Sequence, residues 1–152
     1  MNKYAELSAR HQKEVDAFPI GAAFSKKQFA EMMKNWGLDP DKDVDKIYKL
    51  PVSGCYIRKS DDAAFTEMMN RHAREMQEFF AADTTGERGG HFHQALLYEL
   101  ENHEYCVTYD PEPALNACGF SVEEIETNAA LYNALNAATA DIAKAHEEMD
   151  SR

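Results

Sequence analysis

The residues best suited to chemistry are histidines and carboxylates that gather between positions 91 and 110 of the sequence. They are His91, His93, Glu99, His103, Glu104 and Asp110. Histidine nitrogens and carboxylate oxygens bind divalent metals, and the same groups serve as general acids and bases. Glu99 and His103 stand four positions apart, so their side chains can meet on one face of a helix. A half-buried carboxylate would then orient the imidazole and favour its protonated form.

A second interpretation of Glu99 and His103 is a hydrogen-bonded pair that only fixes its own helix, and such pairs are common. His91 and His93 are two positions apart, so a continuous helix cannot direct both toward one ion. The sequence therefore predicts no cofactor. If a divalent metal binds, the candidate ligands are His91, His93 and His103. The candidate acid–base residues are Glu99, His103 and Glu104.

Two other segments resemble ligand loops but lack required residues. The alternating aspartates of residues 39–45 suggest a calcium loop, which needs glycine at its sixth position and glutamate at its twelfth; here those positions hold Val44 and Leu50. The glycine-rich segment 83–90 precedes a helix and would suit an anion, but it lacks the Gly-Lys-Ser/Thr ending of a phosphate loop. We interpret it as a flexible connector. The sequence also lacks the G-x-S-x-G and H-E-x-x-H motifs of serine hydrolases and zinc proteases.

The elements that must position these residues are mainly helical. Apolar spacing predicts helices over about 3–17, 26–36, 61–82 and 91–103, a short helix after Pro111, and a last helix that Ser121 opens. Ser25 and Ser60 are the expected N-caps of the second and third helices, and Gly37 is placed to end the second. Residues 46–50 and 55–59 favour strands and flank a turn, so they predict a hairpin, and 105–108 suggests a further strand. We expect an α+β, mainly helical single domain over 1–152 with a small β-hairpin or short sheet. The helix within 1–20 is a candidate peripheral element.

Apolar stripes identify the residues expected in the core. His72 lies among Phe and Met residues of the third helix, which favours a core histidine over a ligand. Methionine-rich stripes on the second and third helices fit either a core or an adaptable binding groove, and the sequence leaves both open. The stripe expected on the last helix consists of Ile125, Ala129, Tyr132, Leu135, Ile142 and Met149.

The charge of the chain is unevenly distributed. The net charge is −11; residues 1–75 hold 13 Lys/Arg against 12 Asp/Glu, whereas residues 76–152 hold 3 against 15. An acidic C-terminal half repels phosphate backbones, so we expect no direct nucleic-acid binding, but it attracts basic proteins, including nucleic-acid-binding ones. The simpler alternative is that these charges serve solubility. No stretch has the length and hydropathy of a membrane span, and three cysteines without a C-x-x-C pair suggest a cytoplasmic protein.

Several segments carry a resemblance to a known group of proteins. They are residues 47–48, 56–61, 71–72, 83–87 and 98–105, continuing through 108, 110, 114–115 and 119–121. The most specific run is Tyr-Glu-Leu-x-Asn-His-Glu-Tyr at 98–105. Over about residues 24–135 the chain resembles an uncharacterised family of small acidic proteins encoded by phages and integrative mobile elements of Firmicutes. That family has a glycine run where this chain has Pro51-Val52-Ser53-Gly54, which argues against a shared glycine-loop ligand site.

The resemblance implies a mobile-element accessory protein in the bacterial cytoplasm and implies no activity. Our first hypothesis is a non-enzymatic protein that binds and modulates a basic host or element protein through its acidic C-terminal half. The alternative is a metal-assisted or acid–base enzyme that uses the cluster His91, His93, Glu99, His103 and Glu104. In that enzyme Arg58 and Lys59 would hold an anionic substrate, and Asn102 and Tyr105 are further candidate binding residues. The sequence leaves the oligomeric state open.

Overall fold

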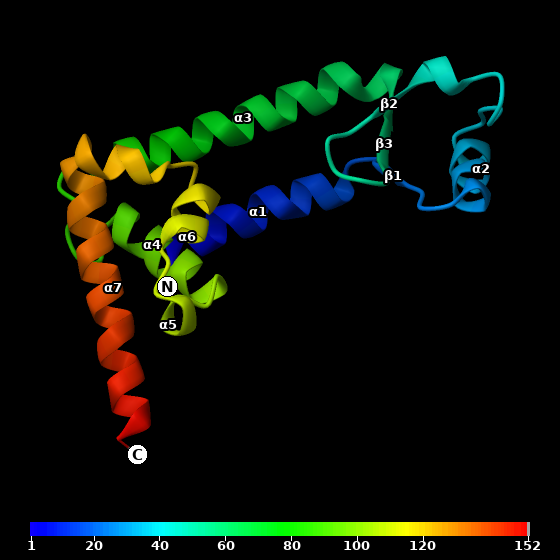
Figure 1. Cartoon of the computed structure of the whole chain (residues 1–152). Helices are drawn as coiled ribbons and strands as arrows, with labels where there is room; N and C mark the ends of the chain where they lie inside the picture. The colour runs from blue at the N-terminus through cyan, green and yellow to red at the C-terminus, as the bar shows by residue number, and fades with distance from the viewer. Residues whose placement is uncertain (152) are drawn as a thin grey trace. The chain divides into compact units, whose positions relative to one another are not determined.

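The structure, a computed structural model, describes residues 1–151, and the chain divides into two compact units. Unit 1 consists of Met1–Arg10 and Arg74–Arg152, and unit 2 consists of His11–Ala73. Two long helices, α1 (Lys3–Ala17) and α3 (Asp62–Ala81), contribute residues to both units. The predicted α+β, mainly helical fold with a small sheet is confirmed (Figure 1). The expectation of a single domain over the whole chain stays a prediction.

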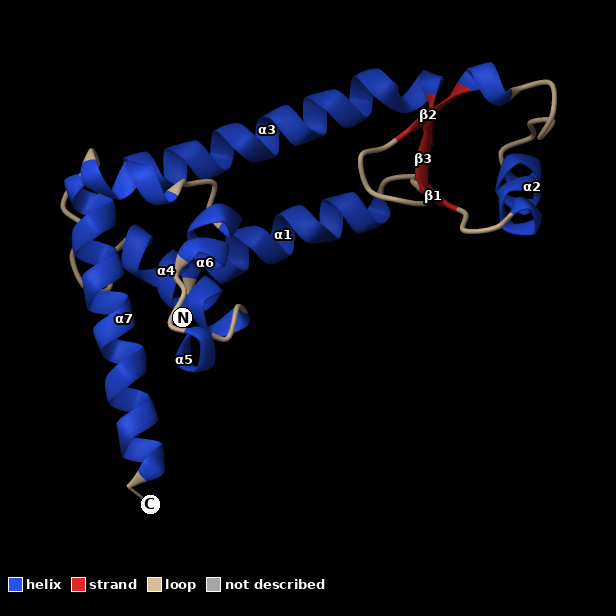
Figure 2. Ribbon diagram, viewed as in Figure 1, coloured by secondary structure: helices blue, strands red, loops and turns tan. Residues whose placement is uncertain are grey.

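A small antiparallel sheet organises unit 2 (Figure 2). Strands β2 (Ile47–Lys49) and β3 (Cys55–Arg58) form the predicted hairpin, with Ile47 opposite Arg58. Gly54 takes a positive φ of 79° in the turn, a conformation that glycine adopts without strain. A third strand, β1 (Gly21–Ala22), pairs with the other edge of β3, so the strand order is β1-β3-β2. A strand of only two residues has no alternating pattern of apolar and polar side chains, and for this reason the sequence did not predict β1.

Helix α2 (Lys26–Asn35) packs against this sheet and is capped as predicted. Ser25 Oγ accepts a hydrogen bond from the Gln28 backbone N–H, and Gln28 Oε1 accepts one from the Phe24 N–H. Met32 and Met33 are buried with Ile47 in the core of unit 2. These two methionines therefore belong to a core and not to an open groove.

The parts of α1 and α3 that lie in unit 2 meet through polar side chains. The rings of His11 and His72 stack with centroids 4.0 Å apart, and His72 Nε2 lies 3.0 Å from Glu14 Oε2. Arg71 also forms an ion pair with Glu14, and hydrogen bonds from Arg71 and then His72 lower the pKa of Glu14 from 4.5 to about 2. The prediction that His72 is a core histidine is confirmed, since it is buried.

Unit 1 is a helical assembly around one apolar core (Figure 1). Its further helices are α4 (His91–Asn102), α5 (Tyr105–Thr108), α6 (Glu112–Ala117) and α7 (Ala129–Asp150). Fully buried residues of this core are Leu96, Leu100, Leu115 and Leu131. Tyr4 of α1 is also in the core, with only 3% of its surface exposed. The start of the first helix thus packs into the core of unit 1.

Three local predictions were wrong at element boundaries. Residues 105–108 form the helical turn α5 instead of a strand, because Glu104 and Tyr109 on either side adopt left-handed φ values of 56°. Ser121 caps a 3₁₀ turn, Val122–Glu126, through a capping box with Glu124, and α7 starts later, after Asn128. Likewise Ser60 lies inside a 3₁₀ turn, Lys59–Asp61, that precedes α3.

The buried face of α7 also differs from the predicted stripe. Tyr132 and Met149 are exposed. The buried face consists of Ala130, Leu131, Ala134, Leu135, Ala138 and Ile142. A start at Asn128 fixes which side chains face the core, and alanines on that face allow the neighbouring helix α4 to approach closely.

Candidate functional site

The predicted pairing of Glu99 with His103 is present in the structure. His103 Nε2 lies 3.2 Å from Glu99 Oε2 at the end of α4. A residue that the sequence did not suggest completes the cluster: the Tyr4 hydroxyl donates a 3.0 Å hydrogen bond to Glu99 Oε1. Glu99 is buried, whereas 39% of the His103 side chain is exposed. The carboxylate therefore has a partner on each oxygen and connects the core of unit 1 to its surface.

The buried groups around Glu99 are held in their protonated forms. Burial, together with the Glu99 charge, raises the pKa of the Cys118 thiol to about 12. Burial and neighbouring negative charge also raise the pKa of Tyr4 above its ordinary value. A thiol is nucleophilic only as the thiolate, so Cys118 is inert at neutral pH, and Tyr4 acts as a hydrogen-bond donor and not as a base. The arrangement stabilises a buried carboxylate, which is a structural task.

His93 has a partner on both ring nitrogens. Its Nδ1 accepts a 3.1 Å hydrogen bond from the Gly89 backbone N–H, and its Nε2 lies 2.8 Å from Asp141 Oδ2. Because Nδ1 is an acceptor, the ring is the neutral tautomer that donates from Nε2. Arg88 binds the same carboxylate, with 2.8 Å between Nη2 and Asp141 Oδ1, and hydrogen bonds from Arg88 and then His93 lower the pKa of Asp141. His93 thus fastens α4 to α7.

His91 is directed elsewhere, so the histidines do not converge. Its Nδ1 lies 2.6 Å from the Phe79 carbonyl oxygen, and its ring stacks on the Phe79 ring with centroids 4.0 Å apart. Glu104 is exposed at the start of α5. Within residues 1–151, no group of three or more His, Cys, Asp or Glu side chains is placed to hold a metal ion.

The glycine-rich segment 83–90 is anchored on both sides and is not the flexible connector that the sequence suggested. The Asp83 carboxylate accepts hydrogen bonds from the backbone N–H groups of Thr85, Gly86 and Phe92, and these bonds lower its pKa despite its partial burial. Since Asp83 occupies the N-terminus of α4, it takes the place that an anion would need. Asn133 of α7 also donates to the Thr85 carbonyl oxygen at 3.1 Å.

The remaining predicted binding residues are divided between the units. In unit 2, Arg58 forms a 2.8 Å ion pair with Asp61, and its guanidinium lies 5.7 Å from the centre of the Trp36 ring. The Lys59 ammonium lies 5.0 Å from the centre of the Tyr48 ring. In unit 1, Asn102 is exposed at the end of α4, and Tyr105 is half-buried in α5. Arg58 and Lys59 thus have local partners in unit 2.

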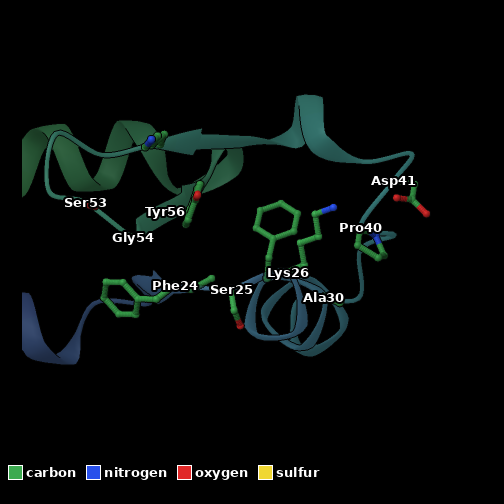
Figure 3. Close-up of a pocket in the computed structure, with 12 residues that line it drawn as sticks. Phe24, Ser25, Lys26, Ala30, Pro40, Asp41, Ser53, Gly54 and Tyr56 are labelled. Carbon is green, nitrogen blue, oxygen red and sulfur yellow. The ribbon is translucent and has the colours of Figure 1, made fainter.

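Unit 2 has an open groove of about 790 Å³ (Figure 3). It lies between the start of α2, the loop with Pro40 and Asp41, and the hairpin with Tyr56, and Lys26 and Lys49 add positive charge. The cap formed by Ser25 and Gln28 already uses donors and acceptors at the start of α2. The groove is therefore an irregular surface of mixed charge and not a built ligand site.

The exposed surface around α5 in unit 1 combines carboxylates with apolar side chains, and we name it the α5 surface. Its carboxylates are Glu101, Glu104, Asp110 and Glu147, and its exposed apolar residues are Val107 and Tyr109. Helix α5 contacts the later turns of α7, which brings these residues of distant sequence position together. In the part of the chain that the structure describes, Glu101, Glu104 and Glu147 form no ion pair.

The division into units coincides with a division of charge. Unit 1 holds six Lys/Arg and 17 Asp/Glu, whereas unit 2 holds ten of each. The whole net charge of −11 therefore belongs to unit 1. The sequence halves indicated this asymmetry, but only the fold shows that the N-terminal residues 1–10 join the acidic unit.

The chain matches a known protein family. The profile of a family described as a family of unknown function (DUF7659) matches residues 3–141. No curated protein and no solved structure matches the chain. Of the helices in residues 1–151, none combines the length and the apolar character needed to span a bilayer.

Proposed function

The chain belongs to this family of unknown function, and we propose from its own residues that it is a non-enzymatic accessory protein that binds and modulates a basic protein through the α5 surface of unit 1. The observation that carries the proposal is the segregation of charge: unit 1 has all the net charge of −11, and unit 2 is neutral. A field of one sign on one unit attracts basic partners and accelerates their association.

The composition of the α5 surface supports binding over simple solubility. A surface that served only solubility would present charges without large apolar side chains. Here Val107 and Tyr109 are 71% and 68% exposed, between carboxylates that have no basic partner in residues 1–151. Exposed aromatic residues within a polar rim are the usual composition of a protein interface, in which a few anchors supply most of the binding energy.

Several finer points belong to the same proposal. The motif at residues 98–105 supports an origin in a phage or integrative element of Firmicutes and action in the bacterial cytoplasm. The partner is a basic, nucleic-acid-binding protein of the host or the element, because a dense group of carboxylates attracts a positively charged protein surface. The protein itself does not bind nucleic acid, since its acidic unit repels phosphates.

The enzyme alternative has less support from the geometry. His91 and His93 are each directed to structural partners, and Cys118 is protonated at neutral pH. Among the candidate acid–base residues only Glu99 and His103 meet, and Glu99 is also bound by Tyr4. These contacts stabilise α4 and the core without presenting an open position for a substrate.

Charge-reversal variants test the proposal in pull-downs from bacterial lysate. Glu101→Lys with Glu147→Lys alters the α5 surface, and Glu31→Lys with Glu67→Lys makes the same charge change at exposed positions of unit 2. We expect the wild-type protein to retain a basic protein at ~0.1 M salt and lose it at ~0.5 M, because the Debye length falls from about 10 Å toward 3 Å. The unit 1 variant should lose the partner and the unit 2 variant should keep it. Equal retention by both variants contradicts the proposal.

A further inference from the structure

We propose that the cavity between α5 and α7 receives an arginine side chain of the basic partner, an inference that rests on the function proposed above. The cavity has a volume of about 230 Å³ and lies entirely within unit 1. Sites for drug-sized ligands and cofactors occupy roughly 300–1,000 Å³. The α5–α7 cavity is below that range, so its size suits one long side chain.

The lining of the cavity favours a cation with a flat, delocalised charge. Tyr105 of α5 and Tyr109, its C-cap, contribute two aromatic rings with centroids 6.0 Å apart and planes inclined at 75°. A guanidinium group stacks on such rings and binds carboxylates through two parallel hydrogen bonds, whereas an ammonium does neither as well. Glu147 supplies a carboxylate at the cavity, and Ile142 supplies an apolar contact for the methylene groups of the side chain.

The charged groups around the cavity are compatible with a cationic guest. His146 also lines the cavity, but its Nε2 lies 3.4 Å from Asp150 Oδ2, so that a protonated ring would be balanced by a carboxylate. Lys144 is the only Lys or Arg of α7, and it is not among the lining residues. The carboxylates Glu101 and Glu104 of the α5 surface add to the attraction of a cation.

The backbone of α5 holds the cavity in a preformed state. Glu104 and Tyr109, at the two ends of α5, both have φ near 56°, a left-handed conformation that costs a non-glycine residue roughly 1–2 kcal/mol. The Tyr109 N–H donates a 2.8 Å hydrogen bond to the Tyr105 carbonyl oxygen, which closes the turn and places both tyrosines beside α7. Strained conformations of this kind occur preferentially at binding sites.

Cys106 provides a direct readout, because it is exposed and lines the cavity. The probe is a short peptide of alternating glycine and arginine, with matched lysine and citrulline peptides. We expect the arginine peptide to slow alkylation of Cys106 by about tenfold at saturation, while Cys55 in unit 2 reacts at an unchanged rate and serves as the internal control. Buried Cys118, with its pKa raised to about 12, should remain unlabelled throughout.

Variants separate the cavity from the general acidic field. Tyr109→Gly removes the ring at a position whose left-handed backbone suits glycine, and Glu147→Gln removes the carboxylate; both should weaken binding of the arginine peptide about tenfold. Glu123→Gln removes the same charge from unit 1 at the 3₁₀ turn Val122–Glu126, outside the cavity lining, and should change affinity less than about twofold.

The outcomes distinguish failure of this inference from failure of the proposed function. If the arginine and lysine peptides bind equally well with strong salt dependence, and Cys106 is not protected, the cavity is not the anchor but the acidic unit still binds basic partners. If neither peptide binds at low salt, both the inference and the proposed function are overturned. Selective protection of Cys106 by the arginine peptide, lost in Glu147→Gln, supports both.

Discussion

Single residues of unit 1 show how a buried carboxylate can be tolerated in an apolar core. Among residues 1–151, no buried side-chain nitrogen or oxygen lacks a hydrogen-bond partner. Glu99 meets this condition through the hydrogen bond from Tyr4, and its other oxygen lies 3.2 Å from His103 Nε2. The two partners come from the two separate chain segments that form unit 1. A hydrogen bond to a carboxylate contributes more than one between neutral groups.

The Tyr4 hydroxyl should therefore be important for stability. Tyr4→Phe leaves one oxygen of Glu99 without its donor in a site that water reaches poorly, so we expect a loss of about 1–3 kcal/mol in the free energy of unfolding. Urea denaturation at neutral pH measures this loss. Tyr48→Phe, at an exposed position of unit 2, is the control and should change stability little. Equal effects of the two substitutions would contradict the structural role of the cluster.

The residue-scale contacts were predictable only where they are local. The pairing of Glu99 with His103 follows from their spacing of four on a helix, and the sequence indicated it. The bond from Tyr4 joins residues 95 positions apart, and no pattern in one sequence reveals such a partner. The same limit applies to the α5–α7 cavity, because Tyr109 and Glu147 meet only after the chain has folded.

At the scale of elements, caps and turns were predicted more reliably than conformations set by tertiary contacts. Ser25 and Gly37 bound α2 as their residue types indicated, and the hairpin around Gly54 formed as expected. Residues 105–108 are Tyr-Cys-Val-Thr, which favour strands, yet packing against α4 and α7 holds them in a helical turn. Propensity is a weak guide when a segment is only four residues long.

The loop before α4 permits a sharp test at this scale. Gly86 has a φ of +69°, and a Cβ added there would lie 1.9 Å from the Ala130 carbonyl oxygen of α7. Gly86→Ala should therefore cost about 3 kcal/mol or more in the free energy of unfolding, from steric overlap added to backbone strain. Gly89→Ala is a matched control, because Gly89 also has a positive φ, of +86°, but has open space around it.

Thermal and urea denaturation of the two glycine variants compare these costs. We expect Gly89→Ala to lose only the roughly 1–2 kcal/mol of a left-handed alanine. If Gly86→Ala loses no more than Gly89→Ala, the loop does not dock on α7 as closely as the structure describes.

At the scale of the whole molecule, the separation of charge has a cost as well as a use. A net charge of −11 carried by unit 1 repels itself, and this repulsion opposes folding. The sequence halves predicted the asymmetry, because charges can be counted without a structure. They could not show that the exposed apolar residues Val107 and Tyr109 lie within the acidic surface, since exposure depends on packing.

Screening should therefore stabilise the free protein. We expect a rise from ~0.1 to ~0.5 M NaCl to add about 1 kcal/mol, which corresponds to roughly 2–4 °C in melting temperature for a chain of this size. Scanning fluorimetry measures the shift. The variant that combines Glu101→Lys with Glu147→Lys should start from a higher melting temperature and gain less from salt. A melting temperature that falls with added NaCl would show that attractive ion pairs dominate instead.

Unit 1 is formed by two chain segments that are far apart in the sequence, and this has a consequence for its synthesis on the ribosome. Tyr4 and Leu7 are made before the rest of unit 1, and Tyr4 bonds to Glu99, which follows 95 residues later. At about 5–20 residues per second, translation of that interval takes roughly 5–20 s. During this time the start of α1 is without the core that it will join. Once Tyr4 and Leu7 have left the ribosome, chaperones and proteases can reach these side chains until Glu99 and its helix have been made.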